Sequence, residues 1–323
     1  MPRERVPAQL PPEAHVRRAQ RGVALVLVMW VGILLTVIAS AFIVERRTEA
    51  MVISNSVSMA RAEAMADAGV QRAIFELYRN DSSPDMWKRD GTRYAMELDG
   101  VPVSVEIRDE SAKIDINTAT EPLLRGLLVS SGLPDDEATR VLDAILDWRD
   151  PDDLKRPNGA EEPEYKAAGL SYKPANGPFQ AIEELQLVLG MRPELYRRMA
   201  PSITVFSRSP GVNTQIASRE VLLAIPGATT EVVDDYIVRR EAARDAGQPL
   251  PMFPVSTGVS GFTMVASIKS EARIDDGTVF AREAVAILRP APRKAVTFLA
   301  WRQPPAALAD DAPVNPSPES SNR

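Results

Sequence analysis

The sequence predicts an α+β protein in which a long N-terminal helix packs on an antiparallel sheet and a large helical domain interrupts that sheet. Three observations support this fold class. The region 23–79 contains no proline and is rich in helix-forming residues. Short runs suited to strands lie on either side of two Asp-Gly pairs, one before and one after the middle of the chain. The middle itself, 117–248, has a helical period.

The N-terminal region begins with the apolar segment Val23–Val44, which carries no charged residue. As a helix it would rise about 33 Å, which is enough to cross a hydrocarbon core of about 30 Å. Arg17, Arg18 and Arg21 precede the segment, which predicts a cytoplasmic N-terminus. A plain membrane anchor fits this pattern. A secretory signal cut after Ala41, leaving Phe42 first, is an alternative.

A third interpretation concerns Gly22, which stands between the basic leader and the apolar segment. A small residue there resembles the site cut by prepilin peptidase, which would leave Val23 as the new N-terminus. Pilins carry a glutamate as fifth mature residue, whereas Leu27 occupies that position here. A carboxylate in lipid costs about 2.5–3.5 kcal/mol and persists only when it is paired. In pilins its partner is the terminal amine of the subunit ahead, so a tip subunit would not need it.

Beyond the apolar segment the helix is expected to continue to about Arg79. Ala66, Val70, Ile74 and Leu77 fall on one face of it, which predicts packing against a domain. The expected strands are Tyr94–Leu98 and Val101–Asp109, then Phe262–Arg273 and Val279–Leu288, with Ala295–Trp301 as a last strand. The predicted domains are therefore a leader (1–22), a transmembrane part (23–44), an α+β domain (45–116 and 249–302), an inserted helical domain (117–248) and a disordered tail (303–323).

The inserted domain contains a repeat. Asp115–Asp150 and Val212–Glu241 each open with an apolar-Asn-Thr cap, followed by a short helix, a turn and a longer helix. Phe179–Met199 is a third segment expected to form a helix-turn-helix. These units resemble helix-hairpin-helix or SAM-like repeats, some of which bind DNA phosphates. A membrane-anchored DNA receptor is therefore an alternative function, although the acidic turn at Asp135 and Thr229 in place of a glycine argue against it.

The composition makes catalysis improbable. The chain has 38 basic and 44 acidic side chains, a net charge of −6, no cysteine and one histidine, His15, which lies in the leader. A processed chain would have no imidazole, which excludes Ser-His-Asp triads and His-ligated zinc. We therefore expect a protein that is not an enzyme, binds no nucleic acid and favours hard cations.

An acidic loop, Asp147–Tyr165, is the candidate cation site. Calcium takes about six to eight oxygen ligands, supplied by carboxylates and backbone carbonyls. The loop is rich in proline and glycine, so we expect no helix within it. A solvated acidic loop without metal is the alternative that composition leaves open. The candidate ligands are Asp150, Asp152, Asp153, Glu161, Glu162 and Glu164.

The order of these features resembles the minor pseudopilin K family of type II secretion systems. The segments that carry the resemblance are RGVALVLVMWVGILL, RAEAMADAGVQRAI, DESAKIDINTA, DWRDPDD with NGAEEPEY, and FQAIEELQLVLGM. The resemblance implies a pseudopilin fold with a helical insertion, cleavage at Gly22 followed by methylation of Val23, and structural calcium held by the six carboxylates. A minor pilin of a type IV pilus would have the same kind of leader, cleavage site and apolar N-terminal helix, so it remains an alternative.

The resemblance also implies a place and partners. The family caps and nucleates the tip of the periplasmic pseudopilus, as a single-pass protein of the bacterial inner membrane with its main domain in the periplasm. The implied partners are minor pseudopilins I and J, with H as a further candidate, prepilin peptidase, the inner-membrane secretion platform and exoprotein substrates.

Overall fold

The computed structural model describes residues 20–79, 86–255, 263–289, 296–304 and 315–316. The leader up to residue 19 and most of the predicted tail lie outside the described residues. Two compact units divide at Ala60 and Arg61. The first consists of the N-terminal part of helix α1 (Gln20–Tyr78), and the second holds the rest of the described chain.

The N-terminal unit is the apolar half of α1. By length and composition, α1 is the one helix in the described part of the chain that could cross a membrane: its most apolar window has a mean hydropathy of 2.6 and none of it is buried. This agrees with the predicted helix. A single apolar N-terminal helix is consistent with an inner-membrane anchor.

The second unit is built on one six-stranded sheet, whose order is β7-β6-β5-β2-β1-β8. Neighbouring strands are antiparallel, except that β8 is parallel to β1. The bounds are β1 Asp90–Leu98, β2 Val101–Asp109, β5 Val265–Arg273, β6 Val279–Leu288, β7 Val296–Arg302 and β8 Asn315–Pro316. Both predicted hairpins are confirmed. At the first turn Asp99 and Gly100 both have positive φ (50° and 73°), as a two-residue hairpin turn requires.

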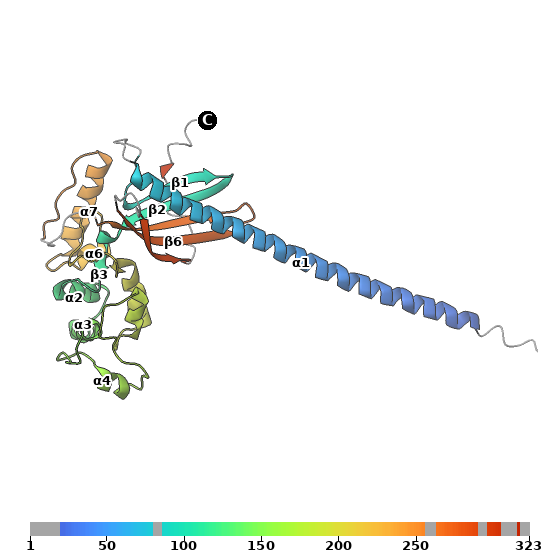
Figure 1. The fold of residues 1–323 in the computed structure, drawn as a ribbon, viewed down its shortest axis with the longest axis horizontal. Coiled ribbons are helices and arrows are strands. Elements are labelled where there is room, and N and C mark those ends of the chain that lie inside the picture. The colour runs from blue at the N-terminus through green and yellow to red at the C-terminus, as the bar shows by residue number, and fades with distance from the viewer. Residues whose placement is uncertain (1–19, 80–85, 256–262, 290–295, 305–314, 317–323) are drawn as a thin grey trace, which may run out of the picture. The chain divides into compact units, whose positions relative to one another are not determined.

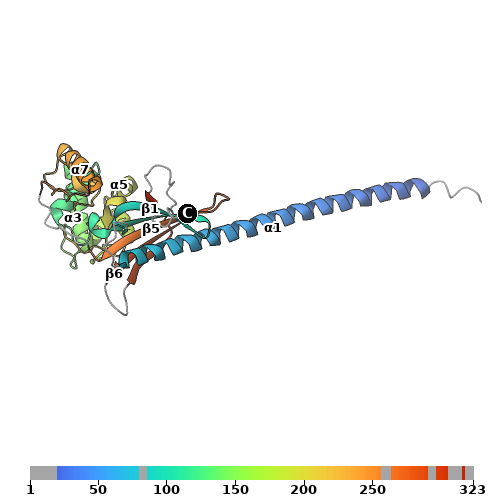
Figure 2. The ribbon, with the colours of Figure 1, turned by 90° about the horizontal axis from the view of Figure 1, so that it is seen from above.

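The C-terminal part of α1 lies across one face of this sheet in Figures 1 and 2. Ala62, Ala66 and Val70 have no exposed surface and pack against Val103, Val105 and Ile107 of β2 among others. The predicted apolar face of the helix is therefore confirmed. At Gly69 the approach is so close that an added Cβ would lie 2.9 Å from Val103 Cγ1.

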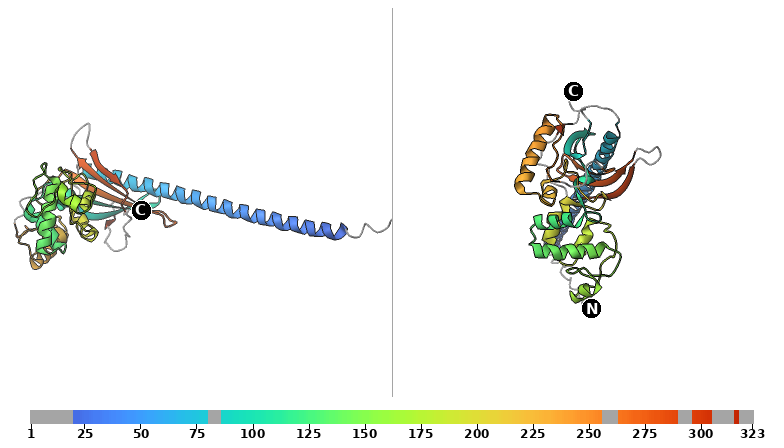
Figure 3. Two further views of the ribbon diagram at one scale, coloured as in Figure 1. Left: turned by 90° about the horizontal axis from the view of Figure 1, so that it is seen from below. Right: turned by 90° about the vertical axis from the view of Figure 1, so that its left-hand side faces the viewer.

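The helical elements lie between β2 and β5 in the sequence and gather beyond one end of the sheet (Figure 3). They are α2 Glu121–Ser130, α3 Asp135–Arg149, α4 Glu162–Ala167, α5 Pro193–Met199, α6 Arg219–Leu223 and α7 Thr230–Asp245, with 3-10 helices η1 Glu110–Ala112, η2 Ile182–Leu187 and η3 Ala200–Ser202. Two short strands, β3 Ile114–Asp115 and β4 Ile203–Thr204, pair in parallel among them.

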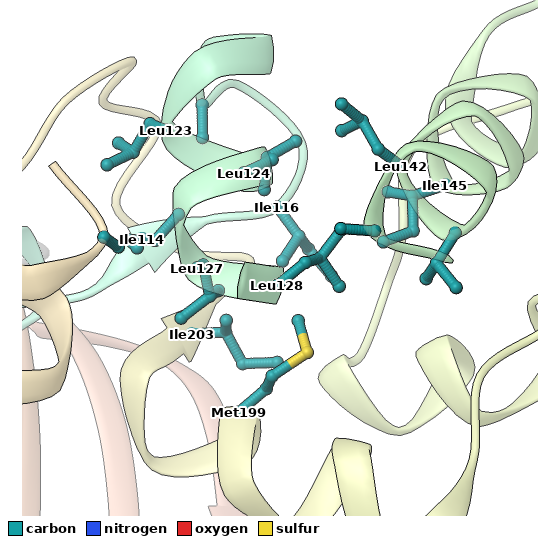
Figure 4. Close-up of a cluster of buried hydrophobic side chains, with 14 of the residues drawn as sticks. Ile114, Ile116, Leu123, Leu124, Leu127, Leu128, Leu142, Ile145, Met199 and Ile203 are labelled. Carbon is teal, nitrogen blue, oxygen red and sulfur yellow. The ribbon is translucent and has the colours of Figure 1, made fainter. Parts of the chain in front are cut away.

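These elements share a hydrophobic core separate from that of the sheet. Figure 4 shows its centre, where Leu124 and Leu128 of α2 face Leu142 and Ile145 of α3. All four side chains are buried because the apolar positions of each helix recur on one face.

The expected helix-turn-helix at Phe179–Met199 is wrong in its first half, which is the 3-10 helix η2. Asn117 fixes the backbone of Phe179, donating to its carbonyl at 2.9 Å and accepting from its N–H at 2.8 Å. Proline at residue 193 opens α5. Only a short segment remains between Phe179 and the start of α5 at residue 193. We attribute the short 3-10 helix η2 to this limited length.

Candidate functional site

The acidic loop begins at the end of α3, which delivers Asp147 into the interior. Its side chain has no exposed surface, and it accepts hydrogen bonds from the Arg156 N–H at 3.2 and 3.3 Å. A Cβ at Gly159 would overlap the Asp147 carboxylate, so the loop can close over this residue only with glycine there. Burial raises the pKa of Asp147, and the nearby Asp150 carboxylate raises it further.

Glu161 precedes α4 and is only 4% exposed. Burial raises the pKa of Glu161 to about 7, and the carboxylates of Asp147, Asp150, Asp153 and Asp152 add to the shift. Several negative charges therefore face one another across a loop that is partly closed to water. Such a cluster disfavours its own ionised form unless a cation neutralises it.

Two buried oxygens of this loop and one of a neighbouring segment have no hydrogen-bond partner among the described residues. They are Asp150 Oδ1, Glu161 Oε1 and Asn176 Oδ1. The Asn176 side chain is fixed by its other end, because Nδ2 donates to Asp153 Oδ1 at 2.7 Å and to the Asp152 carbonyl at 3.1 Å. Unsatisfied buried oxygens are rare in folded proteins, and a bound water or a cation would satisfy them.

The side chains of Glu162 and Glu164 form ion pairs with lysines and do not join the carboxylate cluster around Glu161. Glu162 pairs with Lys166 at 2.7 Å, and the Lys166 hydrogen bond lowers its pKa. Glu164 pairs with Lys155 at 2.8 Å and accepts a hydrogen bond from the Glu161 N–H at 3.0 Å. Both belong to α4, so the expectation that no helix forms in this loop is wrong. The proline at residue 163 lies in the first turn of α4, where its missing N–H leaves no bond unmade.

The structure therefore brings Asp150, Asp152, Asp153 and Glu161 into mutual electrostatic contact, and adds Asp147 and Asn176. Across the described residues, no three acidic or histidine side chains are already closed around a common point. The donor set is nevertheless of the hard, all-oxygen type that fits calcium rather than zinc.

The predicted processing site is part of α1. Gly22 and Val23 have helical backbone, and the leader that precedes Gln20 lies outside the described residues. Cleavage between Gly22 and Val23 stays a prediction.

Comparisons with known proteins bear on the identity of the chain. Residues 106–211 match the family model for protein K of the type II secretion system (T2SS). The type II secretion system protein K of Pseudomonas aeruginosa is 26% identical over 245 residues, covering 68% of this chain and 73% of that protein. The protein of the same name from Klebsiella pneumoniae is 27% identical over 251 residues, covering 69% and 76%. The chain is related to type II secretion system protein K.

The fold agrees with this relationship. The crystal structure of the GspK–GspI–GspJ complex from the type 2 secretion system of enterotoxigenic Escherichia coli contains a chain similar to this one, with a TM-score of 0.54 and 16% identity. The match covers 81% of this chain and all of that one. The resemblance predicted from the sequence is confirmed, and so is the α+β fold with an N-terminal apolar helix and an antiparallel sheet. The comparisons support a minor pseudopilin and favour neither the DNA receptor nor the type IV pilin.

Proposed function

We propose that this chain is a non-enzymatic minor pseudopilin that caps and nucleates the tip of the pseudopilus in type II protein secretion. The observation that carries the proposal is Leu27 within a lipid-length apolar helix, in a chain related to protein K. A subunit without the fifth-position glutamate has no carboxylate to place on a neighbour ahead. Its own terminal amine remains free to pair with the glutamate of the subunit behind.

The helical domain supports a capping role. It is inserted between β2 and β5, and its elements form a hydrophobic core of their own. A bulky unit of this kind would obstruct the addition of a further subunit on its side. The partners we propose are minor pseudopilins I and J, since the similar E. coli chain is part of a GspK–GspI–GspJ complex. The other partners we propose are prepilin peptidase, the inner-membrane secretion platform and secreted proteins. The N-terminus would be cytoplasmic and the main domain periplasmic.

We also propose that the acidic loop holds structural calcium. The residues best placed are Asp150, Asp152, Asp153 and Glu161, with the amide oxygen of Asn176 as a neutral ligand and Asp147 beneath them. When bound, calcium would supply positive charge and ligand bonds to oxygens that are otherwise unpaired. Its role would be to fix the loop between α3 and α4, because clustered carboxylates repel one another.

The helix pairs α2–α3 and α6–α7 support the proposed helix-hairpin-helix or SAM-like repeat. Each pair turns at a glycine with positive φ, Gly132 (95°) and Gly227 (85°). In each, an arginine of the longer helix donates to two backbone carbonyls in or just after the preceding cap, and the arginine is partly buried in the first pair and buried in the second. Arg149 donates to Ile116 and Ala119, and Arg240 donates to Thr214 and Ala217. The repeat would be a structural unit, since Asp135, Asp136 and Glu137 fill the first turn of α3 and would repel DNA phosphates.

The N-terminal mass of the native protein tests the central proposal. Full-length chain purified from inner membranes should begin with methylated Val23. A first residue of Met1 or Phe42 would contradict it. A chain deletion should abolish secretion through the type II system, and Leu27→Glu should impair it by restoring a carboxylate that has no partner. Retention of twitching motility and of DNA uptake in the deletion strain would separate this function from the two alternatives.

The calcium proposal has its own test. Asp150→Asn should reduce the rise in melting temperature that calcium produces, and it should not lower the melting temperature in chelator, where removing one of the clustered charges relieves repulsion. Glu162→Gln, on the same loop but paired with lysines, is the matched control and should behave like the wild type. An equal loss in calcium and in chelator would assign Asp150 a purely structural role.

A further inference from the structure

A groove lies at the seam between the inserted helical domain and the sheet. Its volume is about 320 Å³. One wall comes from the segments around Phe179 and Phe206, and the other from β5, the end of β6 and Leu299 of β7. Met264 and Leu299 are 56% and 40% exposed, so the walls present apolar surface to solvent. Flexible methionine side chains adapt to differently shaped apolar partners.

Two arginines, Arg208 and Arg289, line this groove, and its described lining includes no acidic side chain. The nearest carboxylates, Asp115 and Asp109, lie behind the lining and are bonded to the backbone N–H groups of Arg208 and Thr263. Both arginines are exposed, and within the described residues neither forms an ion pair. The groove is therefore a basic site on a chain whose net charge is −6.

The neighbouring cavity of about 340 Å³ provides a contrast. It shares Phe206 and Leu299 with the groove, but its bases are already neutralised. Lys113 pairs with Glu110 at 2.8 Å, and Arg302 pairs with Glu283 at 2.8 Å. The two arginines of the groove differ from these bases in having no ion pair with a described residue.

Arg208 is also held at an unusual backbone conformation. Its φ is 54°, a region that favours glycine. Its N–H donates to Asp115 Oδ2 at 2.7 Å, and Asp115 is only 1% exposed, so a buried carboxylate maintains the strained turn. A glycine would satisfy this backbone at lower cost. The backbone of Arg208 therefore has a fixed conformation, while its guanidinium is exposed at the groove.

We propose that this groove binds an acidic segment of a partner protein whose carboxylates are flanked by apolar residues. Two guanidinium groups match two carboxylates, each able to accept a bidentate pair. The apolar walls would cover the side chains on either side of those carboxylates. A free phosphate would neutralise the arginines but leave the walls exposed, so a peptide explains more of the surface. The inference does not depend on the pseudopilin assignment.

The test uses full-length protein in nanodiscs of zwitterionic lipid and a fluorescein-labelled probe peptide, acetyl-Leu-Asp-Phe-Glu-Leu-amide. Saturable binding below about 1 mM is expected at low salt. The peptide with Asn and Gln in place of Asp and Glu should bind at least about tenfold more weakly. Absence of saturable binding, or equal binding of the neutral peptide, would overturn the proposal.

Variants place the binding at the groove. Arg208→Glu with Arg289→Glu should weaken binding at least about tenfold. The matched control, Arg198→Glu with Arg273→Glu, reverses two exposed charges outside the groove and should change affinity less than about twofold. Arg208→Gly removes the guanidinium and relieves the strained φ, so it should lose affinity while melting no lower than the wild type. If both pairs of charge reversals weakened peptide binding equally, the effect would come from the net charge of the protein and not from the groove, and the proposal would be wrong. Displacement of the probe by inorganic phosphate or by phosphatidylglycerol vesicles at equal charge would identify a simple anion site instead.

Discussion

Replacing Glu161 with glutamine should stabilise the protein without calcium and remove its response to calcium. Unfolded chain ionises this carboxyl near its ordinary value of 4.5, whereas the folded protein holds the proton until about pH 7. Between those values the unfolded state has released a proton that the folded state keeps, so stability falls as the pH rises. The difference of about 2.5 in pKa corresponds to about 3.5 kcal/mol of unfolding free energy at most, at about 1.4 kcal/mol per unit. Glutamine keeps the shape and one oxygen but carries no charge.

The assay is denaturant unfolding of the full chain in detergent, with chelator or calcium, at about pH 5 and about pH 8. In chelator at the higher pH, Glu161→Gln should exceed the wild type by about 2–3 kcal/mol, and the difference should shrink to below about 1 kcal/mol at the lower pH. In calcium the order should reverse, because the variant has lost a ligand.

Glu162→Gln is the control for this experiment, since Glu162 lies one residue away but pairs with Lys166 and Lys173. It should not change the calcium response. A variant at Glu161 that is neutral or destabilised in chelator at the higher pH would refute the argument from repulsion. Calcium stabilisation that persists undiminished in Glu161→Gln would refute its role as a ligand.

Two further predictions concern the packing of the fold. Gly69→Ala should destabilise the protein by about 1–3 kcal/mol in chemical denaturation, because its Cβ would enter the sheet face occupied by Val103, whereas Gly32→Ala, with nothing within 4 Å, should not. Arg240→Met should cost about 1–3 kcal/mol, because it leaves the Ala217 carbonyl without a donor and the Thr214 carbonyl with only the Tyr236 hydroxyl. Arg239→Met, which loses an exposed pair with Asp235, should cost below about 0.5 kcal/mol.

The sheet and α1 could be predicted from the sequence because their signals are local. The apolar period of α1 identifies its packed face residue by residue, as the burial of Ala66 and Val70 confirms. The Asp99-Gly100 pair determines the first hairpin because both residues tolerate positive φ. Each of these inferences depends on residues within a few positions of one another.

The cation site could be predicted only in part, because its geometry depends on distant residues. Asp147 has the spacing of an ordinary helix residue, and its burial depends on Gly159, twelve positions later. Asn176 lies beyond the acidic loop and reaches it through tertiary contacts with Asp152 and Asp153. From composition alone, Glu162 and Glu164 are as good candidates for calcium ligands as the other carboxylates of the loop. Composition does not show that they pair with Lys166 and Lys155 instead.

The two hydrophobic cores determine how far the effect of calcium should spread. Trp148 and Tyr165, at either end of the acidic loop, belong to the core of the inserted domain, whereas Val105 and Ile268 belong to the core of the sheet. Removing calcium should therefore speed amide hydrogen exchange in α3 and α4 while leaving β2 and β5 protected. Exchange that quickens equally in both cores would mean that they unfold as one unit. The insertion would then be an integral part of the sheet's stability, and a separate, calcium-stabilised cap would no longer describe the molecule.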